Sequence, residues 1–340
     1  MRHFAAILLV CALGSFCATA HASEKEEMQI VRGEVGHYGG RLVIAERAEP
    51  KTLNPVIATD APSREVLGRL HADLIHINRL TQKTEPALAK SWSISHDGTT
   101  FVLKLRKGIR FSDGHPFSAD DVLFTFQVYL DEKLNSPNRD LLMVGNKPIT
   151  VEKIDPHTVR FHLAQPYAAA ERMFDSIAIL PKHTLEAAYR EGKLGQTWNL
   201  NTAPAEIAGL GPFRLKQYVA GQRVVLERNP HYWKADANGA RLPYLDEIAF
   251  VFVGNEDAQV LQFQGGSTDL ISRVSAENYA LLSREAAAHG YQLNDLGPSL
   301  EYNFLFFNLN DLSSRGVPEV AAKQAYVEAV LLRTLVEKED

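Results

Sequence analysis

The sequence predicts a mixed α/β protein with more than one core. Its 340 residues are 45% hydrophobic and 23% charged, a globular composition in a chain long enough for two or three cores. From Gly39 onward, short runs rich in β-branched and aromatic residues alternate with helical patterns. The net charge of −5 comes without a basic run that could follow a phosphate backbone, so nucleic acid is not expected as a partner.

The first 22 residues have the form of a signal peptide. An apolar run over residues 4–17 follows Arg2, and an A-x-A cleavage motif ends at Ala22. The run is shorter than the roughly 20 apolar residues that a membrane anchor requires. Both cysteines, Cys11 and Cys17, lie inside this segment. We therefore expect a soluble, periplasmic mature protein that has neither a disulfide nor a thiolate metal site.

Element by element, the first half of the chain alternates strand and helix signals. Residues 42–45 are predicted to form a strand, and Ser63 is expected to cap a helix that runs to about Leu74. Two alternating segments meet at Asp97-Gly98, which predicts a hairpin between residues 92 and 106.

A capping box then begins the next helix, because the sequence from Ser118 to Asp121 has the S-x-x-D spacing. Residues 158–163 are predicted to form a strand and residues 183–190 a helix that ends near Gly192. The polar stretch 195–206 reads as a crossover between domains, with a boundary near residue 196.

The second half begins with three predicted strands, at residues 213–218, 223–227 and 247–253. Asn255 and Ser275 are each expected to cap a helix, and Gly265 and Gly290 are expected to end these two helices. A last apolar strand is predicted at residues 301–308. No internal repeat is present in the sequence.

Catalytic signatures are absent from the sequence: it has no G-x-S-x-G, H-E-x-x-H or P-loop motif. Gly209-Leu210-Gly211 is similar to the start of a dinucleotide loop. A strand pattern follows it, however, where a helix should receive the pyrophosphate. No cofactor is therefore predicted.

Metal ligands are not predicted either. His71 and His76 do not share a face of the predicted helix, so they are interpreted as ordinary helix residues. Asp113-Gly114-His115 is interpreted as a turn without a third ligand. Asp120 and Asp121 suit the positive end of a helix.

Aromatic residues crowd the segment 302–307. In a strand, Tyr302, Phe304 and Phe306 would share one face. Core packing is the default interpretation of such a face, and the alternative is that its end lines an apolar cleft.

Two longer segments carry a resemblance to a known family. Residues 85–92 (EPALAKSW) and 97–126 are similar to the signature region of family 5 extracellular solute-binding proteins, the oligopeptide, dipeptide and nickel binders of ABC importers. Shorter motifs that support it lie at residues 50–55, 211–213, 228–233, 242–246 and 266–270. The resemblance covers about residues 38–310.

This resemblance implies a periplasmic binding protein-like fold of class II, with mixed sheets in two lobes around a ligand. One lobe would comprise residues 23–71 with 197–300, and a smaller domain, residues 72–196, would be inserted into it. Residues 301–340 would supply the hinge strand and the start of the second lobe. The implied function is capture of oligopeptides or peptide-like solutes by a monomer that delivers them to ABC permease subunits, without catalysis.

The resemblance also implies the ligand-binding residues. Thr59, Asp60 and Ala61 correspond to a loop that pairs its backbone with an extended peptide, and such pairing is indifferent to side chains. A plain connecting loop is the alternative interpretation. The resemblance places Tyr302, Asn303 and Phe304 on a strand beside the cleft. It also implies a cleft position for Phe263, although a helical Phe is more often a core residue.

Family members continue into a whole second lobe, whereas residues 326–340 do not resemble the family. We therefore expect a C-terminally truncated chain, with a frameshift or early stop near Ala325 as the hypothesis, and weak or no ligand binding. The alternatives are an exported hydrolase that uses Asp113, His115 and a carboxylate, and a peptide-holding chaperone with an open apolar strand edge. The sequence does not specify which solute is bound.

Overall fold

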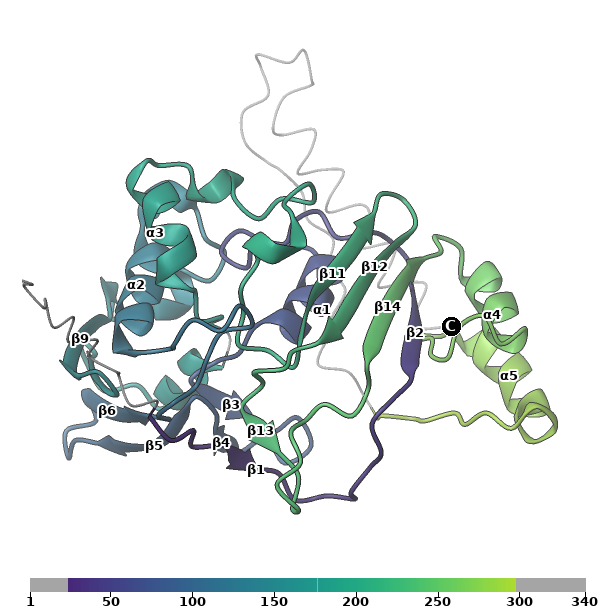
Figure 1. The fold of residues 1–340 in the computed structure, drawn as a ribbon, viewed down its shortest axis with the longest axis horizontal. Coiled ribbons are helices and arrows are strands. Elements are labelled where there is room, and N and C mark those ends of the chain that lie inside the picture. Colours follow the sequence, from purple (N-terminus) through teal and green to yellow (C-terminus); the bar gives the residue numbers. More distant parts are fainter. Residues whose placement is uncertain (1–23, 176, 298–340) are drawn as a thin grey trace, which may run out of the picture. The chain divides into compact units, whose positions relative to one another are not determined.

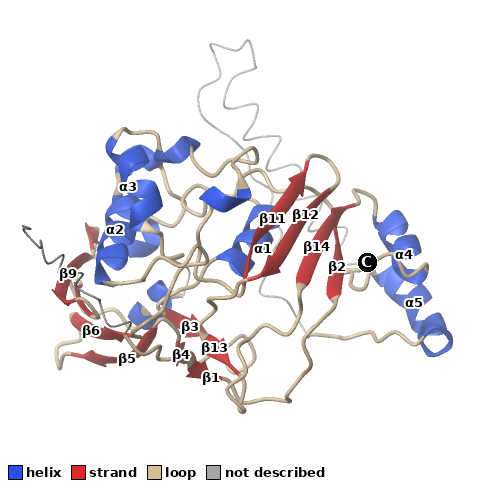
Figure 2. Cartoon of the chain, in the orientation of Figure 1, coloured by secondary structure: helices blue, strands red, loops and turns tan. Residues whose placement is uncertain are grey.

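Two four-stranded sheets dominate the protein in a computed structural model that describes residues 24–175 and 177–297 (Figures 1 and 2). Their strand orders are β5-β6-β10-β9 and β11-β12-β14-β2. The chain divides into two compact units, residues 1–280 and residues 281–340, and both sheets belong to the first. Strands and helices of both kinds are present, as the mixed α/β prediction requires.

The first sheet is antiparallel throughout. It comprises β5 (Ala89–Ile94), β6 (Thr100–Leu105), β10 (Thr158–His162) and β9 (Thr150–Asp155). Gly98 has a φ of 69° in the turn between β5 and β6, a conformation that glycine adopts without steric cost. The predicted hairpin is therefore confirmed.

Helix α2 (Ala119–Leu130) contacts β9, β10 and α3 (Lys182–Arg190). It begins with the predicted capping box, in which the Ser118 hydroxyl accepts a hydrogen bond from the Asp120 N–H and the Asp121 carboxylate accepts one from the Ser118 N–H. The conformation of α2 is thus fixed at its start by local chemistry.

The second sheet is mixed, because β14 and β2 are parallel and the other pairs are antiparallel. It comprises β11 (Phe213–Val219), β12 (Arg223–Arg228), β14 (Glu247–Phe252) and β2 (Arg41–Glu46). Helix α1 (Ala61–Leu70) contacts β11. Strand β2 thus belongs to a sheet whose other strands follow it by more than 160 residues in the chain. Local sequence patterns do not predict such a pairing.

Shorter elements complete the described chain. Two-stranded sheets form from β1 (Gln29–Ile30) with β13 (Lys234–Ala235), β3 (Ile75–Ile77) with β4 (Thr84–Pro86), and β7 (Met143–Val144) with β8 (Lys147–Pro148). The 3₁₀ helices are η1 (Glu132–Leu134), η2 (Asp140–Leu142), η3 (Ala170–Phe174), η4 (Leu194–Gln196) and η5 (Pro204–Glu206). The last two helices are α4 (Glu256–Gln264) and α5 (Ala276–His289).

Both predicted caps of the last two helices are present. The Asn255 side chain accepts hydrogen bonds from two N–H groups of α4, and the Ser275 hydroxyl accepts one from Asn278 in α5. Gly290 follows α5 with a φ of 71°, the left-handed conformation expected after a helix. Among the described residues, no helix combines the length and the apolar character that crossing a bilayer requires.

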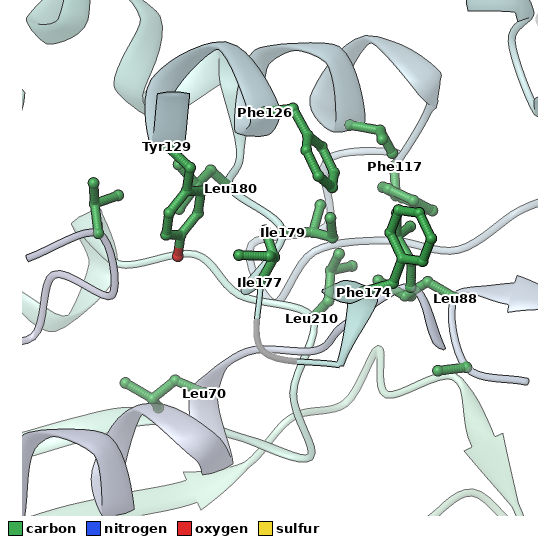
Figure 3. Close-up of a cluster of buried hydrophobic side chains, with 14 of the residues drawn as sticks. Leu70, Leu88, Phe117, Phe126, Tyr129, Phe174, Ile177, Ile179, Leu180 and Leu210 are labelled. Carbon is green, nitrogen blue, oxygen red and sulfur yellow. The ribbon is translucent and has the colours of Figure 1, made fainter. Parts of the chain in front are cut away.

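The core is continuous from one sheet to the other. Phe126 of α2, Phe161 of β10 and Phe174 of η3 form its aromatic centre, with ring centroids 4.7 Å apart for Phe126–Phe161 and 4.8 Å for Phe161–Phe174. Figure 3 shows Phe126 and Tyr129 pointing away from α2 toward the side on which Ile177 and Ile179 lie. Large side chains in contact at these distances account for much of the stability of such a core.

The predicted start and end of α1 were wrong. Asp60, not Ser63, caps the helix, and Leu70, not Leu74, is its last residue. Pro62 explains the start, because proline is tolerated in the first turn, where an N–H has no helical partner. His71 is already extended, with φ −119° and ψ 169°. His71 therefore follows α1, and His76 lies in β3, so neither is the ordinary helix residue that the sequence predicted.

The first sheet lies within residues 72–196, and the second is built from the two segments that flank this range. All strands of the first lie within residues 89–162, and those of the second lie within 41–46 and 213–252. This distribution agrees with an inserted smaller domain, and the assignment of lobes stays a prediction. The predicted signal peptide, the strand at 301–308 and the site residues Tyr302, Asn303 and Phe304 lie outside the described residues.

Candidate functional site

A pocket of about 600 Å³ lies along α1. Pro55 and Ala58 line it from the loop before the helix, and Arg64 and Leu67 line it from the helix itself. Residues from other parts of the chain complete the wall, among them Tyr129 at the end of α2. The pocket is therefore built from α1, from residues before and after this helix, and from partners that the fold brings to them.

Thr59, Asp60 and Ala61 directly follow Ala58 in the chain, but they are not among the residues that line this pocket. Thr59 and Ala61 are exposed, and no described residue accepts a hydrogen bond from the backbone N–H of Thr59, Asp60 or Ala61. The Thr59 carbonyl accepts a hydrogen bond from Arg64 at 2.5 Å, and the Asp60 carbonyl accepts one from the Arg64 N–H. The segment thus presents N–H donors to its surroundings while its carbonyls are occupied.

The Asp60 side chain is committed to the helix. Its Oδ1 accepts a hydrogen bond from the Ser63 N–H at 2.9 Å, and its Oδ2 accepts one from the Ser63 hydroxyl at 2.8 Å. Ser63 in turn accepts hydrogen bonds from the N–H groups of Lys51 and Thr52. These contacts fix the conformation of the segment, so any ligand contact from Asp60 would come from its backbone.

Asp73, His76 and Asp175 form a second feature of the pocket wall. His76 Nδ1 lies 3.3 Å from Asp73 Oδ2 and 3.4 Å from Asp175 Oδ1. Asp175 is almost fully buried, and its carboxylate accepts hydrogen bonds from the Ile77 N–H at 2.6 Å and from Arg79 at 2.7 Å. Two carboxylates and an imidazole therefore meet at one edge of the pocket.

The protein environment shifts the pKa values of two of these groups. Burial raises the pKa of the Asp73 carboxyl above its usual value. The hydrogen bond to Asp73 raises the pKa of His76, because a carboxylate stabilises the imidazolium. The cluster therefore favours a positive charge between its two carboxylates.

His71 also lines the pocket, immediately after α1. It is 7% exposed, and neither ring nitrogen has a hydrogen-bond partner among the described residues. Its ring stacks on Trp198 with centroids 5.6 Å apart. Burial lowers the pKa of His71 to about 4, so the ring is neutral at physiological pH.

Gly209 and Gly211 pack against this end of α1. A Cβ on either glycine would overlap a backbone carbonyl oxygen of Arg69 or Leu70, and the Gly211 N–H donates to the Leu70 carbonyl at 2.9 Å. Strand β11 follows directly. These glycines therefore allow close packing, in agreement with the interpretation that they do not form a dinucleotide loop.

The Asp113-Gly114-His115 turn is confirmed, since the Asp113 carboxylate accepts a hydrogen bond from the His115 N–H and Gly114 has a φ of 89°. The fold adds a partner that the sequence did not suggest, because His183 Nε2 lies 2.7 Å from Asp113 Oδ2 and its ring stacks on His115 at 3.7 Å. The adjacent Ser112 is buried, and its hydroxyl accepts a hydrogen bond from the Gly209 N–H. Ser112 is therefore engaged in a structural hydrogen bond.

Phe263 lies on α4, half-buried, and is not among the side chains that line the pocket at α1. Its proposed contact with a ligand stays a prediction. Asp175 is a site residue that the sequence did not predict, because it lies almost 100 residues away from its partners Ile77 and Arg79. No local pattern marks Asp175, whereas the three-residue spacing of Asp73 and His76 is visible in the sequence.

Two four-stranded sheets, one antiparallel and one mixed, together with helices, are the arrangement expected of the periplasmic binding proteins. Solved structures agree: the oligopeptide-binding protein AppA of Bacillus subtilis, in complex with a nonapeptide, superimposes with a TM-score of 0.62 at 28% identity. That match covers 73% of this chain and 46% of AppA. The class II fold with mixed sheets is thereby confirmed for the described residues.

The particular family follows from the sequence comparisons. The chain belongs to the bacterial extracellular solute-binding proteins of family 5, whose middle-region model matches residues 83–331. A probable ABC transporter-binding protein of Deinococcus radiodurans is 29% identical over 80% of this chain. The periplasmic oligopeptide-binding protein OppA of Escherichia coli is 28% identical over 67%.

Those two matches cover 47% and 42% of the relatives, so the chain spans about half the length of the curated relatives that it matches.

Proposed function

We propose that the protein is the periplasmic solute-binding component of an ABC importer, and that it binds oligopeptides or peptide-like solutes. The peptide ligand is supported by the names of relatives such as OppA and by the nonapeptide bound to AppA. Delivery to membrane permease subunits and export to the periplasm are part of the same proposal and follow from membership of the family. The binding step requires no covalent chemistry.

One observation carries the peptide proposal: no described residue accepts a hydrogen bond from the N–H groups of Thr59, Asp60 and Ala61, which lie in the chain between Ala58 and Arg64 of the pocket wall. An extended peptide offers backbone carbonyls at regular intervals and can pair with such donors as an added strand does. Because backbone groups make this contact, it accepts many peptide sequences. The pocket wall of α1 would then hold a side chain or an end of the peptide.

The test removes one N–H donor and preserves the helix. Ala61 occupies the first position of α1, where proline is favoured, and Asp60 before it has the extended conformation that a following proline requires (φ −90°, ψ 152°). Ala61→Pro should therefore leave α1 intact and weaken binding of pentaalanine by about tenfold, the value of a hydrogen bond near 1.4 kcal/mol. The affinity is measured by NMR titration at peptide concentrations up to the millimolar range.

Ala61→Ser is the matched control, because it changes the side chain at the same position and keeps the N–H. Circular dichroism of both variants checks that α1 persists. Equal affinities of the wild type and Ala61→Pro would contradict pairing at this N–H. Absence of peptide binding in the wild type at millimolar concentrations would contradict the proposed ligand class for this chain.

A further inference from the structure

Asp73, His76 and Asp175 come from different parts of the fold. Asp73 lies between α1 and β3, His76 lies in β3, and Asp175 directly follows η3. Their ligand atoms all lie within 4.8 Å of one another. All three residues line the pocket at α1, so a ligand in the pocket can reach them.

We propose that Asp73, His76 and Asp175 form a binding site for a divalent transition-metal ion of the Zn²⁺ type, with its remaining coordination positions open to the pocket. Carboxylate oxygens and a neutral imidazole nitrogen are donors that Zn²⁺ and neighbouring metals accept. The three residues supply three ligands, and water or a group of the solute completes the coordination. The site does not depend on the peptide proposal.

Two of the three separations between the donor atoms match those around a tetrahedral ion, and the third, between Asp73 and Asp175, is at most 4.8 Å. Donors bound tetrahedrally to Zn²⁺ at about 2.0–2.2 Å lie about 3.3–3.6 Å apart. The observed separations from His76 Nδ1 are 3.3 Å to Asp73 and 3.4 Å to Asp175. A charge-assisted hydrogen bond between imidazolium and carboxylate is shorter, about 2.7–2.9 Å.

Neighbouring groups hold Asp175 in position. The Ile77 N–H donates to its Oδ1 at 2.6 Å, and Arg79 donates to its Oδ2 at 2.7 Å. Oδ1, the oxygen near His76, retains lone-pair capacity for an ion. Hydrogen bonds of this kind orient a ligand and are typical of the surroundings of metal sites.

A further observation concerns polar groups on the pocket wall that lack partners. His71, on the wall of the same pocket, is 7% exposed and has no hydrogen-bond partner at either ring nitrogen among the described residues. The pocket thus contains polar groups that the described protein alone leaves unsatisfied.

An ion-pair network is the competing explanation. If His76 is protonated, its charge and that of Arg79 balance the two carboxylates without any metal. The two explanations differ in what they predict when a metal ion is added. A metal site binds the ion through neutral His76, whereas an ion-pair network keeps His76 protonated and binds no ion.

The experiment uses the full chain after treatment with EDTA and removal of the chelator. Isothermal titration with Zn²⁺ should show one equivalent bound, and Co²⁺ should give visible d–d absorption. His76→Gln should weaken Zn²⁺ binding by at least about tenfold, since even loss of an outer-shell partner costs that much. Asp73→Asn should do the same if His76→Gln fails to fold by circular dichroism.

His96→Gln is the matched control, because His96 is an exposed histidine in the turn between β5 and β6. It should leave the Zn²⁺ affinity unchanged. Equal affinities of the wild type and His76→Gln, or no equivalent bound by the wild type, would overturn the site. Pentaalanine binding is measured independently in the presence of EDTA. Absence of Zn²⁺ binding therefore does not contradict the proposal that the protein binds peptides.

Discussion

The two Asp–His clusters of this protein use the same residue types in opposite settings. In the first, Asp113 closes a turn at the surface, pairs with His183 at 2.7 Å and keeps 30% of its side chain exposed. In the second, Asp175 is buried to 2% side-chain exposure and meets His76 and Arg79 at the edge of a pocket. The first is a local structure with one added contact, whereas every contact of Asp175 in the second depends on the tertiary fold.

This difference shows that environment decides what such a cluster contributes. Water screens an exposed pair, so the pair contributes little to stability. A buried carboxylate loses its hydration and depends on the partners that the protein gives it. We therefore expect substitutions of the buried side chains at the pocket to change the free energy of unfolding more than substitutions in the exposed turn cluster.

The largest expected effect belongs to His71, the most deeply buried histidine at the pocket. Its pKa of about 4 in the folded protein lies below the unfolded value of 6.5, so the unfolded state binds a proton first as the pH falls. Stability from this group is present above pH 6.5 and decreases as the pH falls toward 4, by about 3 kcal/mol in total. Urea unfolding at a series of pH values measures this change.

The variant His71→Leu should lose this part of the pH dependence, because leucine does not titrate. His96→Gln, at an exposed position, should retain it. A wild-type slope between pH 4 and 6.5 that matches the slope of His71→Leu would contradict a neutral, buried His71.

The next effect should come from Asp175→Asn. The amide preserves the shape of the side chain but removes the charge that Arg79 and the Ile77 N–H contact. Loss of a buried hydrogen-bonding charge should cost about 1–3 kcal/mol of unfolding free energy. Equilibrium denaturation in urea measures the cost. An unchanged free energy of unfolding would show that the buried Asp175 carboxylate does not stabilise the fold.

The smallest effect is expected for Asp113→Asn, which is the matched substitution in the exposed cluster. Its contact with His183 should contribute about 0.2–1 kcal/mol, and asparagine can still accept the turn hydrogen bond from the His115 N–H. The same denaturation assay applies. A cost that equals or exceeds that of Asp175→Asn would break the comparison between the clusters.

Local patterns in the sequence were sufficient to predict structures whose hydrogen bonds join residues close together in the chain. The hairpin at Asp97-Gly98 and the capping box at Ser118 are confirmed because their hydrogen bonds join near neighbours. The start of α1 was missed for a related reason, since both Asp60 and Ser63 are good caps and only the observed contact distinguishes them. The end of α1 also determines whether His71 and His76 lie in a helix.

The sequence by itself determined the family, through long motifs such as residues 97–126, and it marked the Thr59–Ala61 segment beside the pocket. Only the tertiary structure brought Asp175 to His76, placed His183 against Asp113 and left His71 buried next to Trp198. The physical reason is that motifs and helix caps depend on residues close together in the chain. Burial, and contacts between side chains far apart in the chain, depend on how the whole core packs.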